Sequence, residues 1–251
     1  MTSEPLPHRY RARCCTNAAC GLRFPVSEGS ELGASCPRCG SETRFADEAY
    51  ATWPAPAKAG RDLRLALLLD NVRSLRNVGS ILRTADGVGL HHAYLGGITP
   101  TPDHPKLQKT ALGAESSVPW SAMPDACAGA AQLVASGARL WAIEGGASAC
   151  SLFDPAVGEA LEAARREPER LVVLVLGHEV SGIDPRIVAQ CERTLFIPMA
   201  GIKGSLNVSV AFGIAAYVCR FFWGRRGGVT RCVRAPRGAR QSQARARGAR
   251  G

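Results

Sequence analysis

Cysteines near the N-terminus have the types and the spacing of a metal site. They form two close pairs, Cys15 with Cys20 and Cys36 with Cys39. A glycine follows each pair, and glycine permits the tight turn that brings two thiolates onto one ion. Tetrahedral zinc takes four such ligands, and two short cysteine pairs on neighbouring hairpins supply them. We therefore expect residues 1–45 to form a small zinc ribbon around these four cysteines.

Alternatives to this ligand set remain open at the level of the sequence. Cys14 directly precedes Cys15 and is an alternative first ligand. The pairs are also compatible with buried thiols or with a redox-active C-x-x-C. A segment this short has too little apolar surface to fold around a core of its own, which favours the metal.

The distribution of all ten cysteines argues against a disulfide framework. Five of them lie between Cys14 and Cys39, and the others are scattered singly. Clustered pairs are typical of metal sites in a reducing compartment, and the N-terminus shows no apolar signal segment. The apolar run Leu206–Trp223 is interrupted by polar residues and falls short of a membrane span. These features predict a cytoplasmic protein.

A second stretch with the composition of a binding site is IPMAGIKGSLNVSVAFG, from Ile197 to Gly213. Its loop leaves main-chain N–H and C=O groups outside regular structure, and such groups must find partners. Gly201 and Gly204 are expected to permit backbone shapes and close approaches that side chains would block. The stretch suits a loop that grips a small ligand through its main chain, although a strand-to-helix turn with a serine cap explains the same pattern.

The elements that must position these residues follow from hydrophobic patterning. From residue 62 onward, short apolar runs alternate with segments of helical pattern, which is typical of an α/β domain with a mainly parallel sheet. We expect strands at residues 64–70, 93–99, 139–146, 171–177 and 194–199. We expect helices at residues 78–90, 106–112, 125–136 and 185–191, a surface helix or loop at 159–166, and a longer helix from about residue 205. Asn77 is expected to cap the first of these helices.

Three polar or glycine-bearing loops follow predicted strands: NVRSLRN after Asp70, GHEVSG after Leu176 and AGIKGS after Met199. Sheets of this kind bind ligands beyond the carboxyl ends of their strands. We therefore expect the three loops to meet at one edge of the sheet and to form a single site.

The segments outside this domain differ from it in composition. Residues 46–61 contain two prolines and several alanines, and we expect a linker there. Residues 225–251 contain nine arginines and no acidic residue, so the net charge of +10 leaves only +1 for the remainder of the chain. We expect this tail to be disordered. Its arginines suit salt-sensitive contacts to phosphates, although a tail that only adds solubility is equally compatible with the composition.

The three loops together resemble the three motifs of the SpoU (TrmH-type) branch of the SPOUT RNA methyltransferases. The motifs are NVGSILRTA from Asn77, LGHEVSG from Leu176, and IPMAGIKGSLNVSVA from Ile197. Their order, their spacing and their positions after predicted strands all match, and the resemblance covers roughly residues 64–223. The implied domain is therefore a SPOUT-type α/β fold over residues 62–224, with a C-terminal trefoil knot.

The resemblance also implies roles for single residues. In the family, certain motif positions hold S-adenosylmethionine, largely through main-chain contacts and apolar walls. In this chain those positions are Leu176, Gly177, Ile197, Met199, Ser205 and Leu206. Matched catalytic positions are Arg83, Asn77, Glu179 and Asn207. A guanidinium stays protonated, so Arg83 is expected to orient the ribose 2′-hydroxyl and a neighbouring phosphate rather than to act as a base. Glu179 is placed to pair with Arg83 and hold its rotamer.

The implied activity is methyl transfer from S-adenosylmethionine to a ribose 2′-hydroxyl of tRNA or rRNA. The implied protein is a homodimer, and we expect it to bind neither DNA nor a membrane. A non-catalytic RNA-binding factor with the same fold is the alternative. One residue departs from the pattern, because His178 stands where many relatives carry asparagine. We expect it to be an adaptive loop residue, with a role as a base as the alternative.

Overall fold

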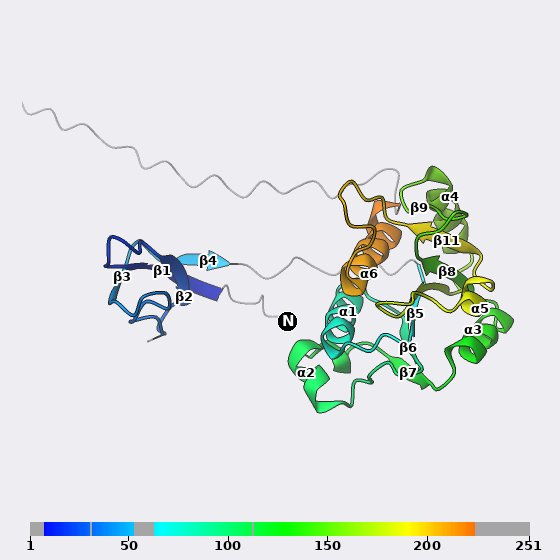
Figure 1. Ribbon diagram of the computed structural model, residues 1–251, viewed down its shortest axis with the longest axis horizontal. Coiled ribbons are helices and arrows are strands. Elements are labelled where there is room, and N and C mark those ends of the chain that lie inside the picture. Colours follow the sequence, from blue (N-terminus) through cyan, green and yellow to red (C-terminus); the bar gives the residue numbers. More distant parts are fainter. Residues whose placement is uncertain (1–7, 31, 53–62, 112, 224–251) are drawn as a thin grey trace, which may run out of the picture. The chain divides into compact units, whose positions relative to one another are not determined.

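The computed structural model describes residues 8–30, 32–52, 63–111 and 113–223 (Figure 1). The chain divides into two compact units, Met1–Gly60 and Arg61–Gly251. The tail predicted at residues 225–251 and most of the linker predicted at 46–61 lie outside the described residues. The proposed domain boundaries therefore stay predictions.

The first unit is an antiparallel sheet of four short strands. They are β1 (His8–Cys15), β2 (Arg23–Ser27), β3 (Thr43–Phe45) and β4 (Tyr50–Thr52). β1 is central, with β2 on one side and β3 on the other, and its first residues pair with β4. β4 lies inside the segment predicted to be a linker, so the sheet continues past residue 45. The hydrophobic pattern missed this strand because all three of its residues are exposed.

The second unit is built on a seven-stranded parallel sheet. Its strands are β5 (Leu65–Asp70), β6 (His92–Gly96), β7 (Trp120–Met123), β8 (Arg139–Ile143), β9 (Cys150–Ser151), β10 (Val172–Leu176) and β11 (Arg193–Phe196). They are arranged in the order β7-β6-β5-β10-β8-β11-β9. This confirms the predicted parallel sheet. The edge strands β7 and β9 were not predicted, since four and two residues are too few for a clear apolar run.

Helices cover both faces of this sheet (Figure 1). They are α1 (Leu75–Gly87), α2 (Pro105–Ala111), α3 (Ala126–Ala135), α4 (Pro155–Arg165), α5 (Pro185–Val188) and α6 (Val208–Tyr217). Alternate residues of β5 point to opposite faces: Leu65, Leu67 and Leu69 pack with α1, α2, α4 and α6, while Ala66 and Leu68 pack with α3 and α5. Burial on both faces explains why β5 reads as a continuous apolar run.

Helix boundaries differ from the prediction at functionally relevant residues. α1 begins earlier than expected, and its N-cap is Ser74, whose side chain accepts a hydrogen bond from the backbone N–H of Asn77. Asn77 therefore lies in the first turn and its side chain is available for other contacts. α6 is capped by Asn207 rather than by a serine. For each helix, the expected cap and the observed cap are both residue types that cap helices well. Local capping propensity alone therefore did not distinguish them.

A π-helical turn, Val218–Phe222, follows α6 and buries a cation. The guanidinium of Arg220 donates hydrogen bonds to the carbonyl oxygens of Leu63 (2.6 Å), Val88 (3.0 Å) and Gly89 (3.3 Å). Val88 and Gly89 follow the last turn of α1, so Arg220 fastens the C-terminal helix to α1 and to the start of β5. Within the described residues, no helix is both long enough and apolar enough to span a membrane.

We predict that Arg220→Met lowers the free energy of unfolding of the second unit by about 3 kcal/mol, because buried carbonyl groups lose their donors. Chemical denaturation of the full chain measures the change. Arg76→Met is the matched control, since Arg76 is an exposed arginine of α1 and surface changes usually stay within about 0.5 kcal/mol. Equal losses in the two variants would contradict the prediction.

Candidate active site

A pocket of about 850 Å³ opens at the carboxyl edge of the parallel sheet. Its walls come from the loops after β8, β10 and β11 and from the start of α6. All six residues predicted to hold the cofactor line it: Leu176, Gly177, Ile197, Met199, Ser205 and Leu206. They enter from two segments that are distant in the sequence, residues 176–177 and 197–206, so the second and third of the expected loops meet at one sheet edge. Their individual roles stay predictions.

The carboxylate of Glu179 connects the second motif to the first. It accepts hydrogen bonds from the backbone N–H groups of Arg73 (3.3 Å) and Ser74 (3.1 Å) and from the side-chain amide of Asn77 (3.0 Å). Burial alone would raise the pKa of Glu179, but hydrogen bonds from its own backbone N–H, from Asn77 and from the other two amides outweigh it and lower that pKa. The carboxylate is therefore ionised at neutral pH.

Asn207 connects the third motif to the first. Its side-chain amide donates to Oδ1 of Asn77 at 3.0 Å, and its own Oδ1 accepts from the backbone N–H (2.9 Å) and the hydroxyl (2.6 Å) of Ser209. Asn77 thus donates to Glu179 and accepts from Asn207. One continuous chain of hydrogen bonds joins three of the four residues predicted to be catalytic, and two of them, Glu179 and Asn207, also line the pocket.

Arg83, the fourth predicted catalytic residue, stands apart from this chain. It lies exposed on α1, six positions beyond Asn77, and it is not part of the pocket wall. The ion pair expected between Arg83 and Glu179 is not formed within the described residues, because the Glu179 carboxylate is occupied by the three donors of the first motif. The guanidinium of Arg83 is therefore available to a ligand.

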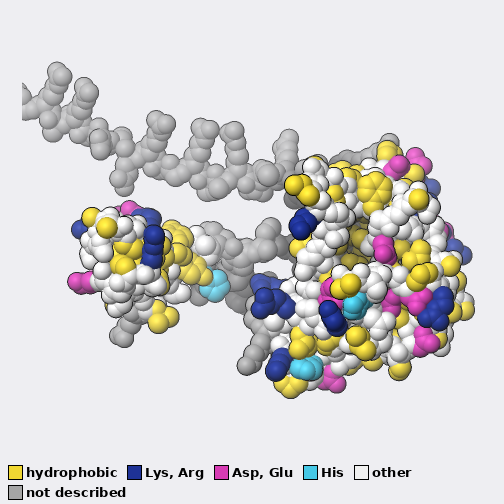
Figure 2. Space-filling view, viewed as in Figure 1, with side chains coloured by type: hydrophobic (Ala, Val, Ile, Leu, Met, Phe, Trp, Pro, Cys, Tyr) yellow, Lys and Arg dark blue, Asp and Glu magenta, His cyan; other side chains and the backbone are white. Residues whose placement is uncertain are grey.

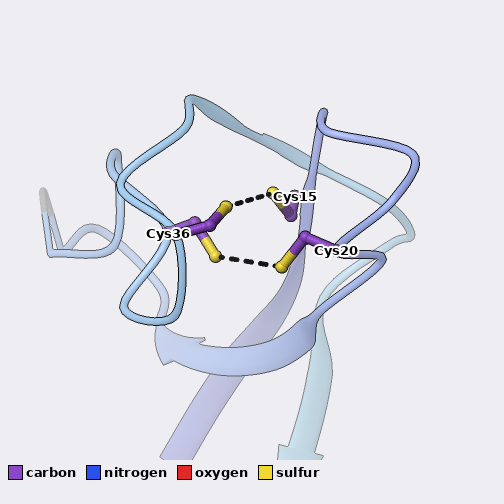
Figure 3. A group of neighbouring side chains, drawn as sticks. Cys15, Cys20 and Cys36 are labelled. Atoms are coloured by element: carbon purple, nitrogen blue, oxygen red, sulfur yellow. Dashed lines mark hydrogen bonds between the residues drawn. The ribbon is translucent and has the colours of Figure 1, made fainter.

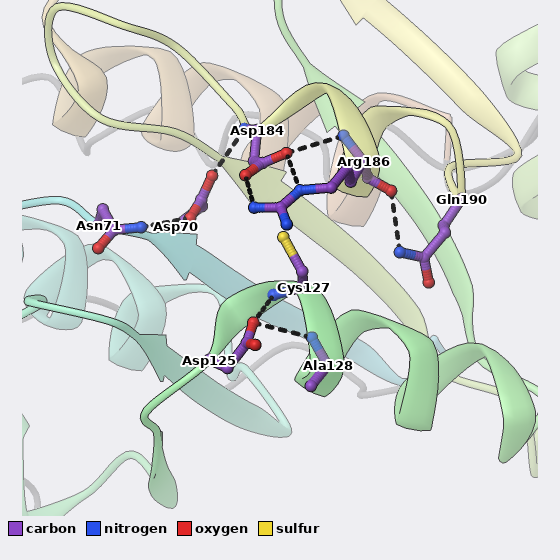
Figure 4. A network of polar contacts seen from close by, with 8 residues as sticks. All are labelled: Asp70, Asn71, Asp125, Cys127, Ala128, Asp184, Arg186 and Gln190. Carbon is purple, nitrogen blue, oxygen red and sulfur yellow. Dashed lines mark hydrogen bonds and ion pairs between the residues drawn. The ribbon is translucent and has the colours of Figure 1, made fainter.

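Residues that the motifs did not indicate support the pocket from behind. Asp70, buried at the end of β5, accepts from the backbone N–H of Asp184 (2.7 Å) and from the side chain of Asn71 (2.8 Å). Figure 4 shows this carboxylate between its two donors. Glu144, after β8, accepts from the backbone N–H of Ile183 at 2.9 Å. Two acids, at the ends of the strands on either side of β10, thus hold the loop after β10. In the sequence, the only signal for this role is an acidic residue that closes an apolar run.

His178 stabilises the turn of its own loop. Its Nδ1 accepts from the backbone N–H groups of Val180 (3.2 Å) and Ser181 (3.3 Å), and its backbone pairs with Gly182 in both directions. Its ring therefore has a local structural task, in line with the expected loop role.

Contacts within the protein require glycine at Gly177 of this site. Gly201 and Gly204 have ordinary negative φ, and a Cβ at either would meet no atom within 4 Å. Neither glycine is therefore required by its backbone conformation or by contact with the protein, and the expected close approach to a ligand stays a prediction. At Gly177, by contrast, a Cβ would overlap the backbone of Gly182 and Ile183. The close approach occurs between two segments of the β10 loop, and only the folded chain reveals it.

We predict that Gly177→Ala weakens binding of S-adenosylmethionine roughly tenfold, because overpacking against backbone costs about 1–3 kcal/mol and shifts the pocket wall. Isothermal titration calorimetry measures the dissociation constant. Gly201→Ala is the control, since it makes the same change in open space and is expected to leave affinity within about twofold. An unchanged affinity in Gly177→Ala would contradict the prediction.

The four cysteines predicted to bind metal converge in the first unit. Their Sγ atoms all lie within 4.8 Å of one another, with 3.5 Å between Cys15 and Cys39 and 3.8 Å between Cys20 and Cys36. Figure 3 shows Cys15, Cys20 and Cys36 directed toward a common centre. Tetrahedral zinc with Zn–S bonds of about 2.3 Å needs sulfurs about 3.8 Å apart. The donor set therefore fits one zinc ion and suggests a zinc ribbon.

The structure also separates Cys14 from this cluster. Neighbouring residues of a strand point to opposite faces, and the sulfur of Cys14 lies 3.9 Å from the guanidinium of Arg23 instead. Within the cluster, burial raises the pKa of Cys15 to about 12, whereas hydrogen bonds from Ser41 lower the pKa of Cys39 to about 6. Of the two adjacent cysteines, Cys15 and not Cys14 therefore belongs to the group that can hold a metal.

Comparison with known proteins identifies the second unit. The profile of the SpoU rRNA methylase family matches residues 64–217, which is more than half of the chain. The chain belongs to this family. A 23S rRNA (guanosine-2′-O-)-methyltransferase, RlmB, from Acinetobacter baylyi is 30% identical over 165 residues, covering 63% of this chain and 60% of that protein. Across the first three curated relatives, the alignment spans between 56 and 67% of their length.

Solved structures of SpoU relatives share the fold. An AdoMet-bound rRNA methyltransferase from Sinorhizobium meliloti aligns with a TM-score of 0.54 at 25% identity, covering 62% of this chain and 56% of its own. A structure described as giving insight into 2-OH methylation of C/U34 on tRNA aligns with a TM-score of 0.51 at 30% identity, covering 65% of this chain and 99% of its own. The SPOUT-type α/β fold is thus confirmed, whereas the trefoil knot stays a prediction.

Proposed function

We propose that this chain transfers a methyl group from S-adenosylmethionine to a ribose 2′-hydroxyl of RNA. One observation carries the proposal: the six residues at cofactor-binding positions of the motifs form one pocket, with the hydrogen-bonded Glu179 and Asn207 on its wall. The pocket volume is in the usual range for small-molecule sites. A solved relative with bound AdoMet supports the cofactor.

The residues of the pocket suit the cofactor chemically. Leu176, Ile197 and Leu206 offer apolar surface for an adenine ring, and the loops around them offer main-chain donors and acceptors. When bound, the cofactor supplies an electrophilic methyl group on a sulfonium. The protein has no bond of its own to make in such a transfer, so its contribution is alignment of the acceptor with the methyl group.

Two features of the protein position the acceptor of the methyl group. They are Arg83 and the chain of hydrogen bonds through Glu179, Asn77 and Asn207, called the polar chain below. Glu179 fixes Asn77 and the N-terminus of α1, and Asn77 fixes Asn207. This rigid arrangement sets the position of α1, on which Arg83 lies. The guanidinium of Arg83 keeps its proton. It therefore acts by donating hydrogen bonds to the ribose 2′-oxygen and to a neighbouring phosphate, which stabilises negative charge as the hydroxyl passes its proton to water.

The substrate class is tRNA or rRNA, since the named relatives act on both kinds of RNA. Neither choice is favoured by the geometry of the pocket. A cytoplasmic location and a preference for RNA over DNA belong to the same proposal. The competing function is a non-catalytic RNA-binding factor, and the intact pocket with its ordered polar chain argues against it.

A homodimer is part of this proposal as well. Large apolar side chains remain exposed along one end of the second unit, at Val210, Tyr217, Phe221 and Phe222 of α6 and the π-helical turn. Contiguous exposed apolar surface marks an interaction site, and two copies of one helix face are self-complementary around a two-fold axis. Light scattering on the purified protein tests this, and a monomer at micromolar concentration would contradict it.

The test of the main proposal uses the purified full chain, methyl-labelled S-adenosylmethionine and unmodified total RNA. We expect label in RNA that survives alkaline hydrolysis as a dinucleotide, because a 2′-O-methyl group blocks cleavage of the adjacent phosphodiester. Fractionation into tRNA and rRNA then gives the substrate class. Tight RNA binding with no alkali-stable label would support the non-catalytic factor instead.

A further inference from the structure

The sheet of the first unit carries a row of aromatic and basic side chains. Arg13 of β1 lies directly opposite Phe24 of β2 and Phe45 of β3 in the strand register. The three residues share one face, together with Arg11 two positions earlier on β1. Figure 2 shows basic and hydrophobic side chains side by side on the visible face of this unit.

Arg11 and Arg13 lack an acidic partner, unlike Arg9 and Arg23 of the same sheet. Arg9 forms an ion pair with Glu28 at 2.7 Å, and Arg23 forms one with Asp47. Arg11 and Arg13, by contrast, have no ion pair within the described residues. Their charge is therefore not neutralised by the protein.

Phe45 holds both free guanidinium groups. The guanidinium carbons of Arg11 and Arg13 lie 4.1 and 4.3 Å from the centre of its ring. Cation–π contacts of this kind fix the plane of a guanidinium without using its N–H donors. The ring itself remains 42% exposed. The face thus combines two fixed cations with an accessible aromatic surface.

The unsatisfied donors show that the described protein does not neutralise these two guanidinium groups. Nε of Arg11 and both Nε and NH1 of Arg13 are buried without a hydrogen-bond acceptor in the described chain. Buried charged donors without acceptors are costly, and native proteins rarely leave them so. Phosphate oxygens accept from guanidinium groups at short distance, and nucleobases stack on exposed aromatic rings and on guanidinium planes.

We propose that this face, made of Arg11, Arg13, Phe24 and Phe45, binds single-stranded RNA. Arg11 and Arg13 contact backbone phosphates, and a base packs against the exposed part of the Phe45 ring. The choice of RNA rests on the proposed function, whereas the need for phosphates and an unpaired base rests on the side chains themselves. An acidic protein segment would satisfy the cations, but it would leave the exposed part of the ring without a base to pack against it.

The test measures binding of the zinc-loaded full chain to a short, labelled, single-stranded RNA of mixed sequence, without S-adenosylmethionine, over a range of salt concentrations. We expect the double change Arg11→Ala with Arg13→Ala to weaken binding about tenfold at moderate salt and to reduce the salt slope by about 0.7 for each lost phosphate contact. Phe45→Leu should weaken binding about tenfold through the lost contact with the base. The C-terminal arginines are present in every variant and contribute equally.

Matched controls come from the same sheet. Arg9→Ala and Arg23→Ala remove the same charge from arginines that are already paired, so they should change affinity less than about twofold. Tyr50→Leu removes a ring of similar exposure, 45%, from a strand position opposite Tyr10 and thus from the other face. Arg13→Gln removes the charge but keeps part of the aliphatic stem, so it separates loss of charge from loss of packing. One zinc per chain in each variant shows that the sheet is intact.

Equal losses in the free and paired arginine variants would overturn the proposal, since general charge would then explain binding. Unchanged RNA affinity in the free-arginine variants would also overturn it. Failure of methyl transfer is a separate result. It would count against the proposed function, while the binding measurement would still decide this inference.

Discussion

Alanine in place of Arg83 is expected to lower the rate constant of methyl transfer by about 10²–10³, with little change in cofactor affinity. The size follows from the loss of one preorganised donor to developing negative charge. Arg83 is absent from the pocket wall, and Glu179 is already satisfied by the first motif. The removed side chain therefore leaves the cofactor site and its polar chain in place. Single-turnover assays on RNA, with calorimetric titration of S-adenosylmethionine, separate the two effects.

Arg76→Ala is the matched control for this prediction. Arg76 lies on the same helix and is exposed like Arg83, so it contributes a similar charge to RNA attraction. We expect it to affect apparent RNA affinity at most severalfold and to leave the single-turnover rate at saturating RNA within about twofold. If both variants lose the same rate at saturation, Arg83 has no special role and the proposed mechanism is wrong.

Removal of zinc is expected to unfold the first unit and to spare the second. Structural zinc contributes about 10–16 kcal/mol to the folding of small zinc domains, far more than a four-stranded sheet of this size can supply. Within the described residues, the two hydrophobic core clusters are built from Leu63 onward, so they do not depend on the metal. We expect one zinc per chain, rapid amide exchange at residues 8–52 after chelation, and an unchanged melting transition for the second unit.

Cysteine variants supply the control for the zinc prediction. Cys36→Ser removes a member of the cluster and should reproduce the effect of chelation. Cys14→Ser removes a thiol that lies next to Cys15 in the sequence but outside the cluster, and it should retain one zinc per chain. Loss of zinc in both variants, or in neither, would show that the geometric assignment of ligands is wrong.

The sequence by itself determined the periodic and local features of this protein. A strand buried on both faces must be largely apolar, so β5, β8 and β10 were recognisable as runs. Two thiolates on a short turn need close spacing, so the cysteine pairs were recognisable as well. The motifs after β5, β10 and β11 carried the family assignment, because side chains that contact a small cofactor must follow one another at set distances along each loop.

Only the tertiary structure decided which groups meet. The partners in the polar chain are separated by 102 residues between Asn77 and Glu179 and by 130 between Asn77 and Asn207. The period of the hydrophobic pattern along the chain indicates the face on which a residue lies. It does not indicate which strand end lies beside that residue in the folded protein. The same reason explains what the sequence did not predict. The place that admits no Cβ is Gly177, where the chain approaches its own backbone. The partner of Glu179 is the N-terminus of α1 rather than Arg83, because the folded first motif places the N–H groups of Arg73, Ser74 and Asn77 next to the carboxylate.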